Sequence, residues 1–387
     1  MNVLVYEWKA YNYKDIIAIF RQMGFSVDVF SYKLSNYDED EEFSKLLISK
    51  LESGSYDFVF TVNYFSVIAD VCNCCHVDYC IWTCDDPLIS LYNESAFYQG
   101  NHIFVFDMIT THELNNMGIR THYLPLASNP NRLDKMFSGQ KSKGRYPVSF
   151  VGSLYERNTY DKIQSTLPEY LRGYFDAVIE AQINISGGNI IEKMLTPQVL
   201  YDLDKYFKLE KSKGSISNLG LIFSTTVLGF KVAAVQRSRY LSSLSKRFEL
   251  SVFSNSDLNC LPLANANGSV DYFTEMPVVF MESDININMT IPNIRSGISL
   301  RVWDVISSGG FLLTDFRAEL LKYFTPDKDI VIYEDELELL DKTDYYLKHE
   351  QQRDEIAQRA LQNVRCNHTI DKRIEELIKI FKEERVY

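Results

Sequence analysis

Short apolar runs alternate with helical patterns along the first third of the chain. The runs NVLVY, YDFVFTVNYF, CIWTC and HIFVF are apolar almost throughout, and amphipathic stretches such as KDIIAIFRQM and DEDEEFSKLLISKLES lie among them. Near-continuous apolar runs separated by helices are typical of parallel sheets that are covered on both faces. The pattern therefore predicts an α/β unit over residues 1–130.

A polar stretch around residues 128–147 interrupts this alternation, and residues 131–146 are the best linker candidate. The alternation then resumes with PVSFVGS, followed by a predominantly helical segment at about residues 160–247 with a break at ISGGN. Strands are predicted within FELSVFSNSD, MPVVFMESDININMTI, FLLTD and DIVIY. Two α/β units in tandem would place a ligand-binding cleft between the carboxyl ends of their sheets.

The stretch RSGISLRVWDVISSGGFLLTD, residues 295–315, is the strongest candidate for chemistry. It predicts a helix over residues 299–308 with one apolar face, and either Ser296 or Ser299 as its N-cap. The free amides at such a helix start can bind an anion. Arg301 and Asp304 lie on another face, where Asp304 could accept hydrogen bonds from ribose hydroxyls. The alternative is a solvated ion pair of ~0.2–0.5 kcal/mol.

The end of that helix and the turn after residue 151 complete the predicted anion site. Gly309 or Gly310 can take the left-handed conformation that ends the helix. In SFVGSLYERN a strand is followed by Gly152 and Ser153, which would let the backbone approach a diphosphate, with Arg157 adding charge. An ordinary strand–helix loop remains the alternative for this turn.

Carboxylates follow two apolar runs in the first half of the chain. Asp85 and Asp86 end CIWTCDDP, and Asp107 ends HIFVFD. Side chains at the carboxyl ends of parallel strands face a ligand cleft, so these three are candidates for orienting an acceptor hydroxyl or acting as a base. The alternative is that Asp86 caps a helix starting in PLISLY.

Composition and charge exclude several classes of protein. The net charge of −12 disfavours nonspecific nucleic-acid binding. No apolar run reaches the ~20 residues of a membrane span, and the N-terminus lacks signal-peptide features, so we expect a cytoplasmic protein. Five cysteines lie between Cys72 and Cys84 without zinc-site spacing, and we predict no metal. No Walker A, GxGxxG, HExxH or catalytic-triad pattern is present.

The C-terminal region beginning SGISLRVWDVISSGGFLLTDF resembles the CgeB-like bacterial glycosyltransferases, with a shorter likeness at FVGSLYERN and a looser one at WTCDDP. The resemblance implies the GT-B fold: two Rossmann-like domains with a central cleft. Residues 1–130 would form the acceptor-side domain and residues 147–368 the nucleotide-sugar domain, with the helical segment inserted. The helix at residues 369–387 would either pack back on the first domain or cover its own.

The resemblance also implies roles for residues. It places Asp304 on the ribose and Ser299, Leu300 and Arg301 at the diphosphate. Where retaining members with an E-x7-E motif carry a further Glu, this chain has Ser296, so a sugar-contacting carboxylate is missing or comes from elsewhere. The fold type implies a mechanism without a metal or other cofactor, because helix ends and Arg stabilise the leaving diphosphate.

The function implied is transfer of a sugar, in the hexosyltransferase class, from a nucleotide-sugar to a hydroxyl acceptor. A UDP-sugar is the expected donor, and a surface glycan, a lipid-linked precursor or a protein is the expected acceptor. The alternatives are a non-catalytic GT-B-like subunit that binds a glycan or a partner protein, and a nucleotide-sugar epimerase. A homo-oligomer is compatible with the sequence.

Overall fold

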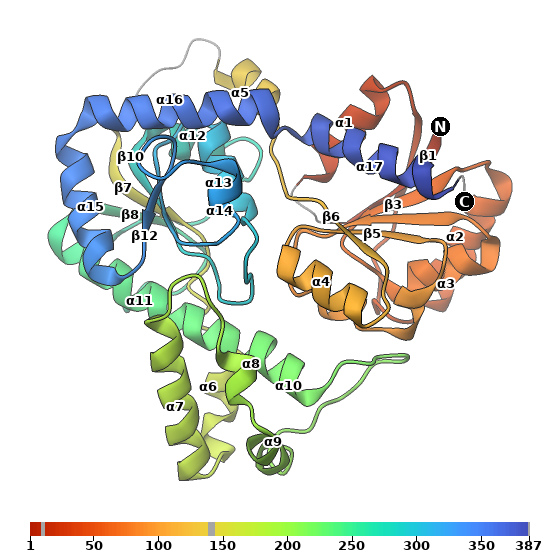
Figure 1. The fold of residues 1–387 in the computed structure, drawn as a ribbon, viewed down its shortest axis with the longest axis horizontal. Coiled ribbons are helices and arrows are strands. Elements are labelled where there is room, and N and C mark those ends of the chain that lie inside the picture. Colours follow the sequence, from red (N-terminus) through yellow and green to blue (C-terminus); the bar gives the residue numbers. More distant parts are fainter. Residues whose placement is uncertain (9–11, 138–143, 386–387) are drawn as a thin grey trace. The chain divides into compact units, whose positions relative to one another are not determined.

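The chain folds into two units, each built on a six-stranded parallel sheet (Figure 1). The computed structural model describes residues 1–8, 12–137 and 144–385. Unit 1 comprises Met1–Ala127, Glu210–Asn218 and Thr369–Tyr387, and unit 2 comprises Ser128–Leu209 and Leu219–His368. The segment Glu210–Asn218, which falls inside the predicted helical insertion, thus belongs to unit 1. Part of the predicted linker, residues 138–143, lies outside the described residues.

Unit 1 has the doubly wound arrangement that its apolar runs predict. Its strands run in the order β2-β1-β3-β4-β5-β6, all parallel. They are β1 (Asn2–Glu7), β2 (Ser26–Ser31), β3 (Phe58–Val62), β4 (Asp78–Trp82), β5 (Asn101–Val105) and β6 (Thr121–Tyr123). The helices are α1 (Tyr13–Gln22), α2 (Glu41–Ser53), α3 (Ser66–Cys75), α4 (Met108–Asn116) and α17 (Ile370–Glu384). Two 3₁₀ turns, Ile89–Leu91 and Glu94–Phe97, follow β4.

Helices α1 and α17 pack together, as do α2 and α3. Helix α17 is held in unit 1 by an apolar contact and an ionic cluster. The ring of Phe381 lies 4.8 Å from those of Phe58 and His102, and the Glu384 carboxylate bonds to His102 and, at 2.9 Å, to His122. Burial opposes ionisation, yet the hydrogen bonds from both histidines hold the pKa of Glu384 below its usual 4.5.

The segment Glu210–Asn218 pairs with the loop around Asn93. Ser215 forms an antiparallel bridge with Asn93, and the Asn93 amide donates to the Lys213 carbonyl at 2.9 Å. The Ile216 N–H donates to the Tyr92 carbonyl at 2.9 Å. These contacts explain why a segment between two helices of unit 2 belongs to unit 1.

The strands of unit 2 run in the order β12-β11-β10-β7-β8-β9, again all parallel. They are β7 (Tyr146–Val151), β8 (Leu250–Phe253), β9 (Asn265–Ala266), β10 (Ser283–Asn288), β11 (Leu312–Asp315) and β12 (Val331–Tyr333). Because β7 to β9 extend in one direction and β10 to β12 in the other, the strand order reverses between β7 and β10. The fold-class prediction of two Rossmann-like domains is confirmed.

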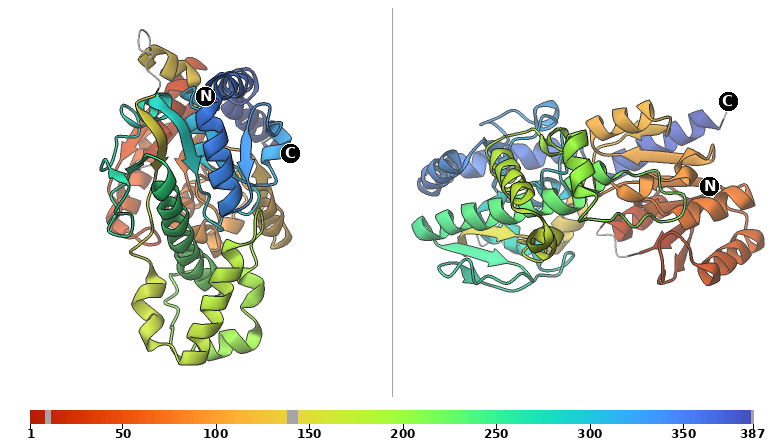
Figure 2. Two further views of the ribbon diagram at one scale, coloured as in Figure 1. Left: turned by 90° about the vertical axis from the view of Figure 1, so that its left-hand side faces the viewer. Right: turned by 90° about the horizontal axis from the view of Figure 1, so that it is seen from below.

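Helices cover both faces of this sheet (Figure 2). On one side α11 packs against α15, and on the other α13 packs against α12 and α16. The helices are α5 (Pro130–Phe137), α6 (Thr159–Ile163), α7 (Glu169–Ile183), α8 (Ile191–Met194), α9 (Pro197–Leu203), α10 (Leu219–Ile222), α11 (Phe230–Arg247), α12 (Met276–Glu282), α13 (Leu300–Ser307), α14 (Leu320–Tyr323), α15 (Glu336–Lys348) and α16 (Glu350–Asn367).

Two elements of unit 2 differ from the sequence prediction. Met276–Glu282 is helical, with Pro277 in its first turn, although MPVVFM was predicted as strand. A short apolar run does not distinguish a buried strand from a buried helix, so the prediction had no independent support. The predicted linker also contains a helix, α5, whose apolar residues are too few to show a clear period in the sequence.

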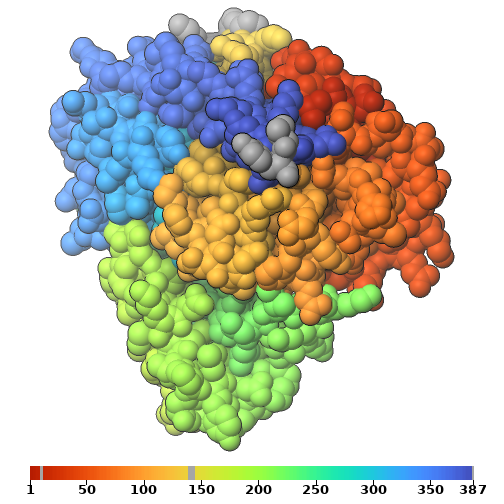
Figure 3. Space-filling model, turned by 45° about the vertical axis from the view of Figure 1, so that its right-hand side comes forward, coloured from red at the N-terminus to blue at the C-terminus, as the bar shows by residue number. Residues whose placement is uncertain are grey.

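The helical segment of unit 2 contains two departures from regular helix. Helices α6 to α9 form the yellow-green part of the surface in Figure 3, and α7 ends at Ile183, before the ISGGN break. Between α10 and α11 the residues Phe223–Gly229 form a π-helical turn. The expectation that no segment reaches the length of a membrane span does not hold for one stretch of the described residues: Leu219–Arg247 is long and apolar enough. Of its apolar window 61% is buried, as in a core helix.

Candidate functional site

The reversal of strand order in unit 2 places the carboxyl ends of β7 and β10 side by side. In open α/β sheets, ligands bind at such a reversal, outside the carboxyl ends of the strands. Gly152 and Ser153 follow β7, and a buried loop leads from β10 to helix α13. The residues that the sequence analysis proposed for donor binding therefore come from two adjacent strand ends.

Helix α13 begins one residue after its N-cap, Ser299. The Ser299 side chain does not cap the helix, and its buried hydroxyl oxygen has no hydrogen-bond partner among the described residues. The amides of the first turn are thus not closed by a capping side chain, which leaves them available to an anion. Leu300 and Arg301 provide the first helical residues, and Gly309 (φ +75°) ends the helix in the left-handed conformation.

Arg301 and Asp304 lie one turn apart on this helix, as predicted. The Arg301 Nη1 is 3.7 Å from the Asp304 Oδ2, and the guanidinium lies over the Phe280 ring at 5.2 Å. Asp304 is only 8% exposed, so the pair is not a solvated surface ion pair. The Tyr272 hydroxyl donates to the Asp304 Oδ1 at 2.8 Å. Tyr272 lies 32 residues earlier in the chain, and no motif predicts this contact.

Ser296 is buried and contacts a carboxylate from another part of the chain. Its hydroxyl donates to the Glu319 Oε1 at 2.7 Å, and the Glu319 N–H donates to the Ser296 carbonyl at 3.1 Å. Glu319 is 2% exposed and precedes α14. The two hydrogen bonds fix the loop that leads into α13, and a carboxylate lies beside the position where the sequence has Ser296.

The turn after β7 is held by its neighbours. The Gly152 N–H donates to the Phe253 carbonyl at 3.1 Å, and the Ser153 hydroxyl accepts from the Tyr155 N–H at 3.0 Å. Arg157 projects into solvent with its side chain 86% exposed, near Glu156. Gly152 and Ser153 thus lie at the strand end, whereas Arg157 lies further along the loop, at the surface.

Arg237 is a charged residue at this site that the sequence analysis did not identify. It comes from α11, and its guanidinium donates to the Ser153 carbonyl at 2.6 Å and to the Met289 carbonyl. It therefore bridges the two loops that follow β7 and β10. The sequence carries no signal for this role, because Arg237 lies among polar residues such as Gln236 and Ser238, and only the fold brings it to the two carbonyls.

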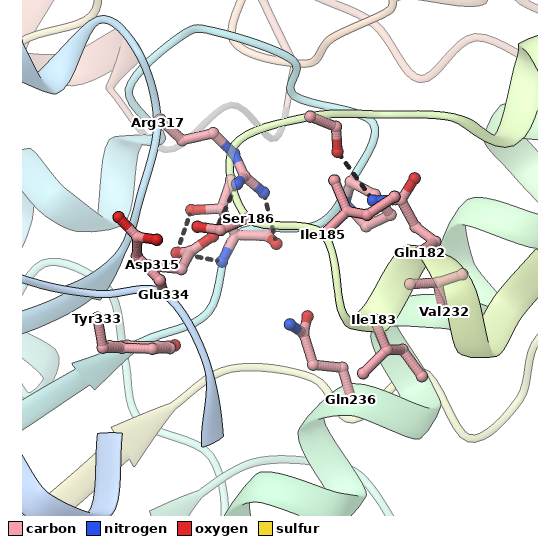
Figure 4. A pocket seen from close by; sticks show the side chains of 13 residues that line it. Gln182, Ile183, Ile185, Ser186, Val232, Gln236, Asp315, Arg317, Tyr333 and Glu334 are labelled. Carbon is pink, nitrogen blue, oxygen red and sulfur yellow. Dashed lines mark hydrogen bonds and ion pairs between the residues drawn. The ribbon is translucent and has the colours of Figure 1, made fainter. Parts of the chain in front are cut away.

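A small polar pocket lies at the carboxyl ends of β10 to β12 (Figure 4). Asp315 accepts hydrogen bonds from the Thr290 N–H and hydroxyl, both at 2.9 Å, and lies 3.1 Å from the Arg317 guanidinium. Gln182 of α7 and Gln236 of α11 complete the wall. The cavity volume of about 20 Å³ accommodates water but not a nucleoside, so we do not place the nucleotide there.

The three candidate carboxylates of unit 1 differ in accessibility. Asp85 is exposed, and its Oδ2 accepts from the Asn63 amide at 2.6 Å. Asn63 follows β3 with a left-handed φ of +65°, a conformation that asparagine tolerates. Asp86 is buried and accepts from the Thr110 hydroxyl, and Asp107 is fully buried as the N-cap of α4. Of the three, Asp85 is the carboxylate that a ligand can reach.

The cysteines of unit 1 do not form a metal site. Within residues 1–8, 12–137 and 144–385, no group of three or more His, Cys, Asp or Glu side chains is arranged to hold a metal ion. Cys72 and Cys80 are buried free thiols, and burial raises the pKa of both well above the usual value. They act as small apolar residues of the core.

Comparison with known proteins bears on both the fold and the site. Residues 237–379 match the glycosyl transferase-like family (Glyco_trans_1_2), and this range contains Arg237, α13 and Glu319. A glycosyltransferase from Rickettsia africae ESF-5 aligns over 99% of this chain and 98% of its own, with a TM-score of 0.56 and 10% identity. The fold is that of the GT-B glycosyltransferases.

Two further GT-B structures align over the whole chain. Sucrose-phosphate synthase from Thermosynechococcus elongatus covers 99% of this chain and 98% of its own, with a TM-score of 0.53 and 9% identity. Anabaena HepE in complex with UDP-glucose covers 99% and 100%, with a TM-score of 0.51 and 9% identity. A search of curated protein sequences found no significant match. At these identities the structures establish the fold and not the substrate.

Proposed function

We propose that the protein is a glycosyltransferase that moves a sugar from a nucleotide-sugar to a hydroxyl group of an acceptor, as the resemblance to the CgeB-like family implies. The observation that carries the proposal is helix α13. It follows β10, one of the two strands between which the strand order of the GT-B fold reverses. Ser299, Leu300, Arg301 and Asp304 lie within a segment that matches a glycosyl transferase-like family.

The donor diphosphate would bind at the start of α13. The uncapped amides and the partial positive charge of the helix terminus favour an anion there, and Arg301 adds a full charge. Stabilising the leaving diphosphate in this way requires no metal ion. Asp304 would accept hydrogen bonds from the ribose hydroxyls, because its carboxylate is buried beside Arg301 and already accepts one hydroxyl, that of Tyr272.

A UDP-sugar is the donor class to test first, with transfer of a hexose. The aligned Anabaena protein is in complex with UDP-glucose, which supports the choice of nucleotide for the first experiment. We propose Asp85 of unit 1 as the residue that orients or deprotonates the acceptor hydroxyl, because it is the accessible carboxylate of the three candidates. The acceptor would be a surface glycan, a lipid-linked precursor or a protein.

A non-catalytic subunit that binds a glycan or a partner protein is the second candidate. Ser296 favours it, because the carboxylate of the E-x7-E motif is absent at that position. Glu319 weakens this argument, since its carboxylate reaches the Ser296 hydroxyl.

The test is a transfer assay with radiolabelled UDP-hexoses and candidate acceptors, comparing the wild type with Asp304→Ala and Asp85→Ala. A glycosyltransferase releases UDP and labels the acceptor, and both variants lose this activity. Tight UDP-hexose binding without release or transfer would favour the non-catalytic subunit. Interconversion of the free UDP-hexose without an acceptor would indicate an epimerase.

A further inference from the structure

The Arg237 guanidinium is buried at the point where the strand order of unit 2 reverses. The side chain is 9% exposed, and its two hydrogen bonds go to the Ser153 and Met289 carbonyls. The guanidinium lies over the rings of Phe150, at 5.4 Å, and Tyr155, at 4.9 Å. It is therefore held on several sides by atoms that carry no net charge.

No carboxylate in the described part of the chain lies within ion-pair distance of Arg237. Asp315 acts on it electrostatically, but the Asp315 carboxylate is engaged with Arg317 and Thr290. Desolvation lowers the pKa of Arg237, which shows that burial disfavours its charge. An arginine stays protonated even so, and a buried charge without an ionic partner lowers the stability of the fold. A negatively charged ligand at this position would offset that cost.

The guanidinium lies directly beneath the turn that would meet such a ligand. A Cβ atom on Gly152 would lie 3.6 Å from the Arg237 Nη1 and 3.3 Å from the Phe150 ring. The backbone of the turn thus lies in van der Waals range of the guanidinium, and a side chain at this position would be crowded by the Phe150 ring. The carbonyl groups of Ser153 and Met289 point toward Arg237, and the hydrogen bonds to them fix the loops after β7 and β10 against each other.

We propose that Arg237 is a positioning residue of the donor site. It holds the Gly152–Ser153 turn in place, and its buried charge attracts the diphosphate of the donor through that turn. The assignment rests on the proposed function in taking a nucleotide-sugar as ligand. Arg237 would be a second cation of the donor site, in addition to Arg301 at the start of α13, and it would touch no ligand atom directly.

The same helix offers a matched control. Arg239 lies two residues further along α11, is partly exposed, and forms a bidentate ion pair with Glu180 at 2.9 and 2.7 Å. A substitution there removes an arginine of the same helix without touching the strand ends. Because exposed ion pairs contribute little, Arg239→Gln should change neither folding nor anion binding measurably.

The experiment measures binding of inorganic pyrophosphate and of UDP by calorimetry at two salt concentrations, for the wild type and for Arg237→Lys, Arg237→Gln and Arg239→Gln. We expect Arg237→Gln to weaken both ligands at least ~10-fold and to flatten the salt dependence of binding. Arg237→Lys keeps the charge and should remain within ~3-fold of the wild type, and Arg239→Gln should match the wild type.

Other outcomes would overturn the assignment. If Arg237→Lys weakens binding as much as Arg237→Gln, the side chain acts through its shape and not through its charge. If Arg237→Gln binds like the wild type, the charge does not act on the ligand. If the Gln variant does not fold, the comparison of Arg237→Lys with Arg239→Gln decides, because the proposal requires the lysine variant to keep its affinity and salt dependence. A wild type that binds neither ligand refutes the proposed function itself.

Discussion

The hydrogen bond between Ser296 and Glu319 provides a test of what holds the loop before α13 in place. Ser296 is 5% exposed and Glu319 is 2% exposed, and the hydroxyl–carboxylate distance is 2.7 Å. Ser296→Ala would remove one donor from a buried carboxylate, and Glu319→Met would leave a buried hydroxyl without this acceptor. Each change should lower the free energy of unfolding by about 1–3 kcal/mol, the contribution of a hydrogen bond to a charged group.

A double-mutant cycle isolates the contact. In the double variant both partners of this hydrogen bond are gone, so its loss should be smaller than the sum of the single losses by at least ~1 kcal/mol. The assay is urea unfolding followed by fluorescence, in which Trp303 of α13, fully buried, reports on unit 2. Single losses that add within ~0.5 kcal/mol would show that the two side chains do not act on each other, and the account of the loop would be wrong.

Three further predictions address individual residues. Gly187→Ala should lower the melting temperature, because φ is +66° and the new Cβ would lie 2.3 Å from an aromatic ring. Gly173→Ala, in α7 with open space around the residue, should stabilise the fold by ~0.5–1 kcal/mol. Thermal unfolding of both variants checks this. The folded-state pKa of Glu384 is lowered, so its contribution to stability is full above the unfolded value near 4.5 and is lost as pH falls through the lower folded value. Glu384→Gln should therefore lose less stability than the wild type between about pH 6 and pH 3, as measured by urea titrations. If the variant loses as much stability as the wild type over this range, the ionic cluster does not stabilise the fold. Asp107→Ala should lower the free energy of unfolding by about 1 kcal/mol through loss of the α4 cap. Asp85→Ala should change the free energy of unfolding by no more than ~0.5 kcal/mol and should reduce the turnover of sugar transfer ~100-fold or more. The reverse pattern would exchange the roles of the two residues.

Local patterns predicted much of the fold. Apolar runs located the inner strands of unit 1, β1, β3, β4 and β5, because strands buried on both faces leave few polar positions to obscure them. Residues 299–308 were predicted as helix and either Gly309 or Gly310 as its left-handed end, and the structure has α13 at Leu300–Ser307 with Gly309 at φ +75°. Both features depend on residues within one or two helical turns of each other, so they can be predicted from the local sequence alone.

Contacts between distant residues could not be predicted in this way. Tyr272 meets Asp304, and Glu319 meets Ser296, through side chains separated by 32 and 23 residues. No period or motif marks such pairs, because the folding of the sheet brings them together. Helix α12 was missed for another reason. Its short apolar run MPVVFM is compatible with either a strand or a helix, and the packing against β7 and β10 decides between them.

The site residues proposed from the sequence divide according to their surroundings. Gly152 directly follows β7, and Ser299 and Asp304 belong to the helix that the loop after β10 leads into, whereas Arg157 lies at the surface. Arg237 entered from the structure alone, because its significance comes from the two carbonyls it reaches.

The central claim is that α13 binds a nucleoside diphosphate, and calorimetry tests it most directly. UDP, GDP, dTDP and CMP are titrated into the wild type, Asp304→Ala and Arg301→Ala. We predict that one nucleotide binds the wild type and that each variant weakens it at least ~10-fold, the loss expected for a hydrogen bond or ion pair to a charged group. If no nucleotide binds, or if both variants bind like the wild type, the donor site is not at α13.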